Sequence, residues 1–171
     1  DGKVDLDHLK ESLCEDTILV STMAVNNEIG AIEPIEEIAK IIKEYNKDIL
    51  YHVDAIQAFG KQIIYPKRIG IDALSMSGHK IHGPKGIGFL FIKNGTKINP
   101  ILFGGGQQEA MRSGTENVPG IAGLGVAAKD AYDNLEENAN KLTELKDYLI
   151  DKLEAMDGVQ VNSKKGTDGA P

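Results

Sequence analysis

The segment DALSMSGHKIHGPKGIGFLFI, residues 72–92, indicates the fold because it holds two apolar stretches joined by a short glycine-rich connection. Residues 72–78 and 86–92 each have the length and composition of a strand. Only about eight residues separate them, whereas a crossover between parallel strands needs about a dozen or more. We therefore expect the second of these strands to run antiparallel to the first.

Upstream of this segment, the sequence predicts a strand, a helix and a second strand. TILVSTMAV (17–25) is apolar and β-branched without polar alternation, which is typical of a strand covered on both faces. ILYHVD (49–54) has the same character. Between them, Pro34 suits a first helical turn, Asn46 can end the helix, and apolar residues recur at helical spacing: Ile35, Ile38, Ile42 and Tyr45. This βαβ unit predicts an α/β fold: a mostly parallel sheet with helices on both faces and one antiparallel strand.

Downstream of residue 92, the sequence predicts a long helix. INPILFGGGQQEAMRSGTEN (98–117) is a loop dense in glycine. Apolar positions then recur at helical spacing over about 117–156, and Gly158 ends the pattern. VQVN (159–162) is expected to start another strand.

Composition and charge exclude several classes of protein. The 171 residues carry a formal net charge of −7, which argues against nucleic acid or an anionic membrane as partner. No apolar run approaches the roughly 20 residues of a membrane helix. The single cysteine, Cys14, cannot form an internal disulfide, so a reducing cytoplasm is expected. Cys14 precedes an apolar run, where we expect a half-buried apolar residue and no nucleophile.

The glycine-rich connection is open to several chemical interpretations. GHKIHGPKG lacks the spacing and final hydroxyl of a nucleotide P-loop. His79 and His82 have no accompanying cysteine or carboxylate cluster, so we expect no metal site. For His82 and Lys85 a solvated turn is the preferred interpretation. Lys80 differs because it follows a predicted buried strand, a position that suits a desolvated amine or a Schiff base.

A Schiff-base lysine suggests pyridoxal 5′-phosphate, and the neighbouring strand ends carry groups that this cofactor needs. Its ring nitrogen needs a carboxylate, which Asp54 supplies. Its phosphate needs hydroxyl and imidazole donors, for which Ser77 and His79 are candidates. Its 3-hydroxyl needs a polar neighbour, for which Gln57 and Asn27 are candidates. Ligands of open α/β sheets bind beyond the carboxyl ends of the strands, where all these residues are expected.

Four motifs add a resemblance to a known family. NNEIG, HVDAIQAFGK, SGHKIHGPKGIGFL and GGGQQEAMRSGTEN resemble, in order and spacing, cysteine desulfurases of the NifS/IscS type. These enzymes belong to the class V aminotransferase family of pyridoxal-phosphate enzymes. RSGTEN resembles the NifS/IscS branch more than the SufS-like branch. The resemblance runs from about Thr17 through the predicted long helix.

The resemblance implies a role for each candidate residue. Lys80 would form the Schiff base and take the α-proton of the substrate. Thr115 would reach the cofactor phosphate of a partner subunit, so the enzyme would be a homodimer with shared active sites. The cofactor-binding set would be Asn27, Asp54, Gln57, Ser77, His79, Lys80 and Thr115. The implied reaction converts L-cysteine to L-alanine, with the sulfur passed to an enzyme cysteine as a persulfide. An iron–sulfur scaffold or another sulfur acceptor would then receive it.

The resemblance also implies a domain organisation and missing parts. Residues 1–156 would form the central part of a cofactor-binding large domain, and residues 157–171 would begin a small C-terminal domain. The nucleophilic cysteine and the arginine that binds the substrate carboxylate would lie beyond Pro171, and a stacking histidine and a phosphate loop before Asp1. A chain without them is expected to be inactive alone. Two alternatives remain: another class V enzyme, such as a selenocysteine lyase or an aminotransferase, and a catalytically silent domain.

Overall fold

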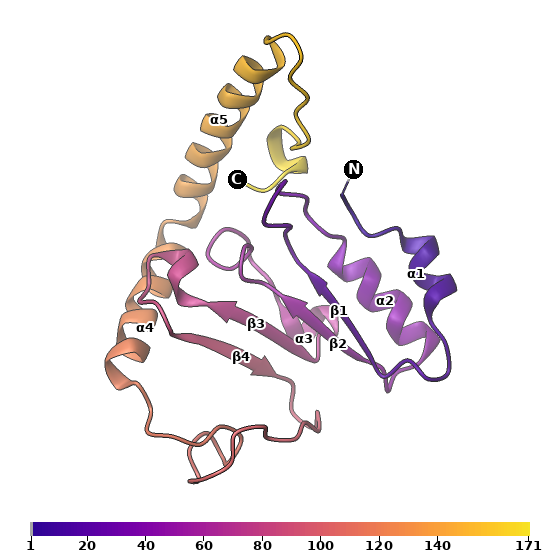
Figure 1. The fold of residues 1–171 in the computed structure, drawn as a ribbon, viewed down its shortest axis with the longest axis vertical. Helices are drawn as coiled ribbons and strands as arrows, with labels where there is room; N and C mark the ends of the chain where they lie inside the picture. The colour runs from indigo at the N-terminus through magenta and orange to yellow at the C-terminus, as the bar shows by residue number, and fades with distance from the viewer. Residues whose placement is uncertain (1) are drawn as a thin grey trace.

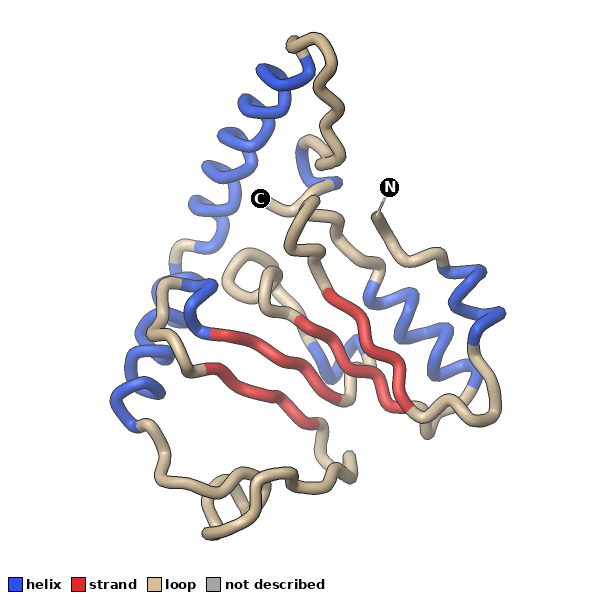
Figure 2. Tube along the Cα trace, in the orientation of Figure 1, coloured by secondary structure: helices blue, strands red, loops and turns tan. Residues whose placement is uncertain are grey.

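A computed structural model describes residues 2–171 and contains one four-stranded sheet flanked by helices (Figure 1). The α-helices and strands are, in chain order, α1 (Leu6–Ser12), β1 (Leu19–Met23), α2 (Ile35–Tyr45), β2 (Leu50–Asp54), α3 (Pro66–Ile69), β3 (Ala73–Ser77), β4 (Gly88–Ile92), α4 (Val118–Asp133) and α5 (Leu135–Glu154). Two short 3-10 helices are η1 (Gly78–Ile81) and η2 (Gly166–Asp168). Figure 2 shows how loops join these elements around the sheet.

The sheet has the predicted topology. Its strand order is β1-β2-β3-β4; β1 pairs with β2 and β2 with β3 in parallel, whereas β3 and β4 are antiparallel. The prediction of a mostly parallel sheet with one antiparallel strand is therefore confirmed. Gly88 allows the close pairing of β4, because a Cβ atom there would collide with the carbonyl oxygen of Met76. The four residues of η1 and the turn after it are enough for this antiparallel return.

Alternation along β2 and β3 divides the sheet into a buried face and a polar face. Tyr51, Val53 and Leu74 are almost fully buried in the main core with Ile38 and Ile42 of α2. Both parallel crossovers advance along the sheet in the same direction, and right-handed crossovers of this kind place α2 and α3 on the same face.

The polar face is held together by a row of side chains across three strands. The Ser21 hydroxyl lies 2.8 Å from Nδ1 of His52, and Nε2 of His52 lies 3.1 Å from the Ser75 hydroxyl. Ser21 and His52 are register partners across β1 and β2, whereas Ser75 pairs in register with Asp54. Ser21 is exposed, and His52 and Ser75 are partly buried. Asp54 lies on the same face of β2, two residues beyond His52.

A buried carboxylate ties α2 to the far edge of the sheet. Asp72 is 4% exposed, and its Oδ2 accepts hydrogen bonds from Nζ of Lys43 (2.5 Å) and from the Tyr51 amide (2.9 Å). Its Oδ1 accepts one from Nζ of Lys93 at 3.0 Å, and Lys43 also donates to the Ile49 carbonyl. Burial alone would raise the pKa of Asp72, but these hydrogen bonds outweigh it and the pKa is lowered.

The prediction of one long helix over about 117–156 is wrong in one respect, because the structure has two helices there. α4 ends at Asp133 and α5 begins at Leu135. Between them Asn134 has φ −112° and ψ 18°, and its side-chain amide donates to the Asp130 carbonyl and carboxylate. The backbone amide of Asn134 also donates to the Asp130 carbonyl, so the two helices are separated by one residue whose backbone is not helical.

The C-terminal segment does not form the predicted strand at residues 159–162, which pair with no other strand in the described chain. Instead, the segment folds back onto α5 and onto the loop after β1. Nζ of Lys146 donates to the carbonyls of Gly166 and Gly169, and Gly169 forms an isolated antiparallel bridge with Ala31. Residues 163–171 therefore lie beside the carboxyl end of β1 (Figure 1).

Candidate active site

The carboxyl ends of β1, β2 and β3 lie at one edge of the sheet, as the sequence predicts. The register pairs Met23, the last residue of β1, with Asp54, the last residue of β2, and Asp54 with Ser75 of β3. Ser77 ends β3 and leads directly into η1, which carries His79 and Lys80. Parallel strands of similar length thus bring polar residues from three loops to the same edge.

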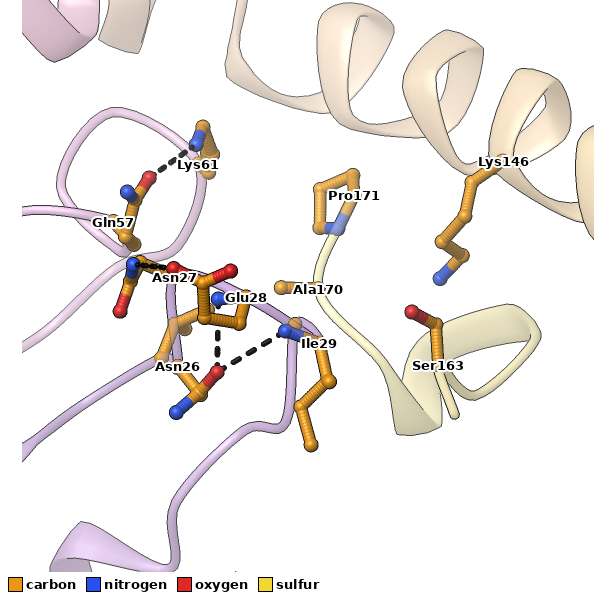
Figure 3. Close-up of a pocket in the computed structure, with 12 residues that line it drawn as sticks. Asn26, Asn27, Glu28, Ile29, Gln57, Lys61, Lys146, Ser163, Ala170 and Pro171 are labelled. Atoms are coloured by element: carbon orange, nitrogen blue, oxygen red, sulfur yellow. Dashed lines mark hydrogen bonds between the residues drawn. The ribbon is translucent and has the colours of Figure 1, made fainter. Parts of the chain in front are cut away.

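A first cavity of about 240 Å³ opens at this edge, with Asn27 and Gln57 among its lining residues (Figure 3). Its opposite wall is the C-terminal segment and α5, with Ser163, Pro171 and Lys146. The loop after β1 is shaped by Asn26, whose Oδ1 accepts hydrogen bonds from the amides of Glu28 (2.9 Å) and Ile29 (3.1 Å). Nδ2 of Asn27 donates to the carboxylate of Glu28 at 2.8 Å.

Asp54 has one engaged and one free carboxylate oxygen. Its Oδ1 accepts a hydrogen bond from the Ile56 amide at 2.9 Å, which fixes the side chain at the start of the turn after β2. No described residue donates to Oδ2. Asp54 is half-buried, so a ligand at this edge has an accessible carboxylate oxygen in a partly desolvated setting.

Ser77 and His79 form a joined polar pair at the end of β3. The Ser77 hydroxyl lies 2.8 Å from Nδ1 of His79. Gly78 between them packs closely, because a Cβ atom there would lie 3.1 Å from Ile87 and from Leu124 of α4. His82 ends η1 with φ 65°, a left-handed conformation that turns the chain toward β4. This pair therefore offers a hydroxyl and an imidazole on a closely packed turn.

A second cavity, of about 330 Å³, holds Lys80 between η1, α4 and α5. The Lys80 side chain is exposed and shares this cavity with Lys61, Asp130, Asn138 and Lys141. Lys61 also lines the first cavity. Lys61 is thus the residue common to the cavity of Asn27 and Gln57 and the cavity of Lys80.

A family model provides the first comparison with known proteins. Residues 1–170 match the model described as aminotransferase class-V. The chain belongs to the class-V aminotransferase family.

Relatives and solved structures agree with this assignment. Cysteine desulfurase IscS of Dictyoglomus turgidum is 50% identical over 154 residues, covering 90% of this chain and 39% of that protein. A solved NifS-like protein matches with a TM-score of 0.87 at 44% identity, over 90% of this chain and 42% of its own. The NifS-like protein of Rickettsia africae matches with a TM-score of 0.88 at 39% identity, over 96% and 47%. This class-V aminotransferase chain thus spans about two fifths of the first of these relatives.

Four sequence-predicted residues of this class-V aminotransferase line neither cavity: Asp54, Ser77, His79 and Thr115. The first three lie at the carboxyl edge of the sheet, at or just after the ends of β2 and β3. Thr115 is exposed on the loop between β4 and α4. The same loop carries exposed apolar side chains, with Phe103 82% exposed and Ile101 87%. Arg112 is also exposed, and its guanidinium donates to the Ser113 carbonyl at 2.7 Å.

Cys14 lies between α1 and β1 and lines neither cavity. It is exposed, which differs from the half-buried position expected from sequence, and its thiol lies 3.4 Å from the Thr17 hydroxyl. None of the helices described between residues 2 and 171 is long and apolar enough to cross a lipid bilayer.

Sequence reasoning missed Lys61 altogether. The signal available was its place in HVDAIQAFGK, four residues after Gln57. Burial lowers the pKa of Lys61, and the like charge of Lys80 lowers it further. Lys61 therefore belongs to the same electrostatic environment as Lys80.

Proposed function

We propose that this chain is the central part of a pyridoxal-phosphate-dependent cysteine desulfurase, which converts L-cysteine to L-alanine. The observation that carries the proposal is the meeting of Asp54, the Ser77–His79 pair and Lys80 at one edge of the sheet. The 50% identity to a cysteine desulfurase supports the choice of reaction within the family. Because the chain spans about two fifths of that relative, activity is assigned to the complete polypeptide.

The available groups fit the cofactor. Oδ2 of Asp54 is free to accept a hydrogen bond from a protonated ring nitrogen, while Oδ1 is held by the Ile56 amide. The Ser77 hydroxyl and His79 imidazole suit a phosphate, which prefers such donors. Gln57 and Asn27 line the adjoining cavity and supply amide groups for the 3-oxygen. The Lys80 amine, on η1, is the group for covalent attachment.

The chain's own residues then have distinct chemical tasks. Pyridoxal phosphate, when bound, supplies an electron sink for charge that develops at the α-carbon of the substrate. Lys80 would take the α-proton of L-cysteine on Nζ, the task of a general base. Asp54 holds the proton of the ring nitrogen, and His79 and Ser77 orient the phosphate. Asn27 and Gln57, which line the first cavity, would limit where the ring can lie.

Sulfur transfer requires a thiol that lies outside residues 2–171. The only cysteine of this sequence, Cys14, is in neither cavity. In the proposed reaction the carbon–sulfur bond of L-cysteine breaks and a sulfur–sulfur bond forms to the enzyme thiol. The proton of that thiol replaces sulfur on carbon, giving L-alanine and a persulfide. The 171 residues alone are therefore proposed to be inactive.

The proposal also covers the domain organisation, the oligomeric state, the sulfur acceptor and the cellular location of the enzyme. Residues 1–156 belong to the large domain and residues 157–171 begin the small one. The exposed apolar side chains near Thr115 support a homodimer in which Thr115 reaches the partner's phosphate site. The persulfide passes to an iron–sulfur scaffold or another acceptor protein in the cytoplasm.

The proposal is tested by product analysis with the natural polypeptide that contains these residues. With L-cysteine, pyridoxal phosphate and a thiol reductant, we expect alanine and sulfide in equal amounts. The Lys80→Ala variant should form neither, while the exposed-lysine variant Lys47→Ala should match the wild type. A keto acid as product would instead indicate an aminotransferase. Selenocysteine as the only substrate accepted would indicate a lyase.

A further inference from the structure

Lys61 lies between the two cavities of the candidate active site. It lines the cavity that holds Gln57 and Asn27 and also the cavity that holds Lys80. Its ammonium group contacts Oε1 of Gln57 at 3.5 Å, and its side chain shares the second cavity with Lys80. Neither the sequence motifs nor the tasks assigned above give Lys61 a role.

The backbone that carries Lys61 is fixed by packing. Ala58 is fully buried, and the Lys61 amide donates to the Ala58 carbonyl at 3.0 Å. Gly60 adopts φ +76°, and a Cβ atom there would lie 2.8 Å from Ile81 of η1 and 3.1 Å from Ala131 of α4. The turn therefore requires glycine and sits against the elements that position Lys80.

Among residues 2–171, the half-buried Lys61 side chain has no acidic partner. Within residues 2–171, no carboxylate lies within 4.0 Å of its Nζ, and its polar contact is Oε1 of Gln57 at 3.5 Å (Figure 3). Burial and the charge of Lys80 both act against the protonated form of Lys61. An anion in the cavity would relieve both effects.

The contact with Lys61 also sets the orientation of the Gln57 amide. An ammonium group only donates hydrogen bonds, so it selects the oxygen of an amide. With Oε1 directed to Lys61, the NH₂ group of Gln57 is left to donate elsewhere in the cavity. An amide N–H next to a positive charge suits an oxygen anion.

We propose that Lys61 is a positioning residue: it orients the Gln57 amide toward the 3-oxygen of pyridoxal phosphate and favours the anionic form of that oxygen. This inference rests on the proposed function. It predicts that removing the charge of Lys61 changes the absorbance spectrum of the bound cofactor as well as the activity.

The test measures cofactor binding and the pH dependence of the visible absorbance band in the natural polypeptide. A nearby cation disfavours proton binding, so removing it in Lys61→Met should raise the midpoint pH of the band by about one unit. The dissociation constant for pyridoxal phosphate should rise about tenfold, the effect of about one charge-assisted hydrogen bond. Lys61→Arg should restore most of both effects. Lys47→Met, at an exposed lysine, should leave both at wild-type values.

A double-mutant cycle separates positioning from a general effect of charge. In a Gln57→Leu background, Lys61→Met should cause a much smaller loss of affinity, because its effect passes through the missing amide. Wild-type values in Lys61→Met, with unchanged circular dichroism, would overturn the inference and leave the proposed function intact. An undiminished loss in the Gln57→Leu background would refute action through Gln57. Failure of the wild-type protein to bind the cofactor would overturn both.

Discussion

Replacing Asp72 by asparagine should destabilise the protein substantially while keeping the shape of the side chain. Asp72 is 4% exposed and accepts hydrogen bonds from Lys43, Lys93 and the Tyr51 amide. Asparagine keeps one acceptor oxygen, but it presents donors to an ammonium and leaves two lysines without a counter-charge. Breaking a fully buried ion pair costs about 3–5 kcal/mol.

The side-chain exposures reduce this figure. The Lys43 side chain is 22% exposed and that of Lys93 is 46% exposed, so water screens part of the loss. We therefore expect the free energy of unfolding to fall by about 2–3 kcal/mol at pH 7. Asp7→Asn is the matched control: its ion pair with Lys10 involves a carboxylate side chain that is 88% exposed. That variant should leave the free energy of unfolding almost unchanged.

The pH dependence gives the same prediction a second readout. The pKa of Asp72 is lower in the folded protein than in the unfolded chain, so its stabilisation is present above the unfolded value. It is lost as the pH falls through the folded value. In urea unfolding followed by circular dichroism, the gap between wild type and Asp72→Asn should be constant from about pH 5 to 8 and narrow below about pH 4. A gap under 0.5 kcal/mol, or one that does not narrow in acid, would refute the reasoning.

Two further substitutions test the packing of the sheet. Gly88→Ala should lower the free energy of unfolding by about 2–4 kcal/mol, because its Cβ atom would collide with the Met76 carbonyl. Gly125→Ala, at an open helical position, is the control and should raise the free energy of unfolding by about 0.5–1 kcal/mol. Equal shifts of the melting temperature in the two variants would contradict this reasoning. Tyr51→Phe removes the 2.8 Å hydrogen bond to Thr22 in the core and should cost about 1 kcal/mol. The cost should largely disappear in a Thr22→Val background, and a full additional loss there would argue against the bond.

The strands were predictable because each one is encoded by the composition and length of its own short segment of sequence. Residues 49–54 and 72–78 are apolar runs of strand length, and the short connection after Ser77 left room only for an antiparallel return. The candidate site followed from the same logic. Once β1, β2 and β3 are parallel, the polar residues that follow them must lie at one edge.

The break at Asn134 was not predictable from periodicity. Apolar residues continue at helical spacing on both sides of it, and asparagine is tolerated within helices. The break is a departure of one residue from helical backbone angles, φ −112° and ψ 18° at Asn134, which the spacing of apolar residues does not encode. Lys61 and Asp72 were missed for a related reason. Their environments come from residues far along the chain: Lys80 and the C-terminal segment for Lys61, and Lys43 for Asp72, 29 residues away.

The central claim is that Lys80 carries pyridoxal phosphate, and reductive trapping tests it most directly. The natural polypeptide is loaded with the cofactor, treated with borohydride and digested, and the modified peptide is located by mass spectrometry. We expect the phosphopyridoxyl group on Lys80 alone, and its loss in Lys80→Ala with no transfer to Lys61. Trapping at Lys61, at several lysines equally, or at none would contradict the account.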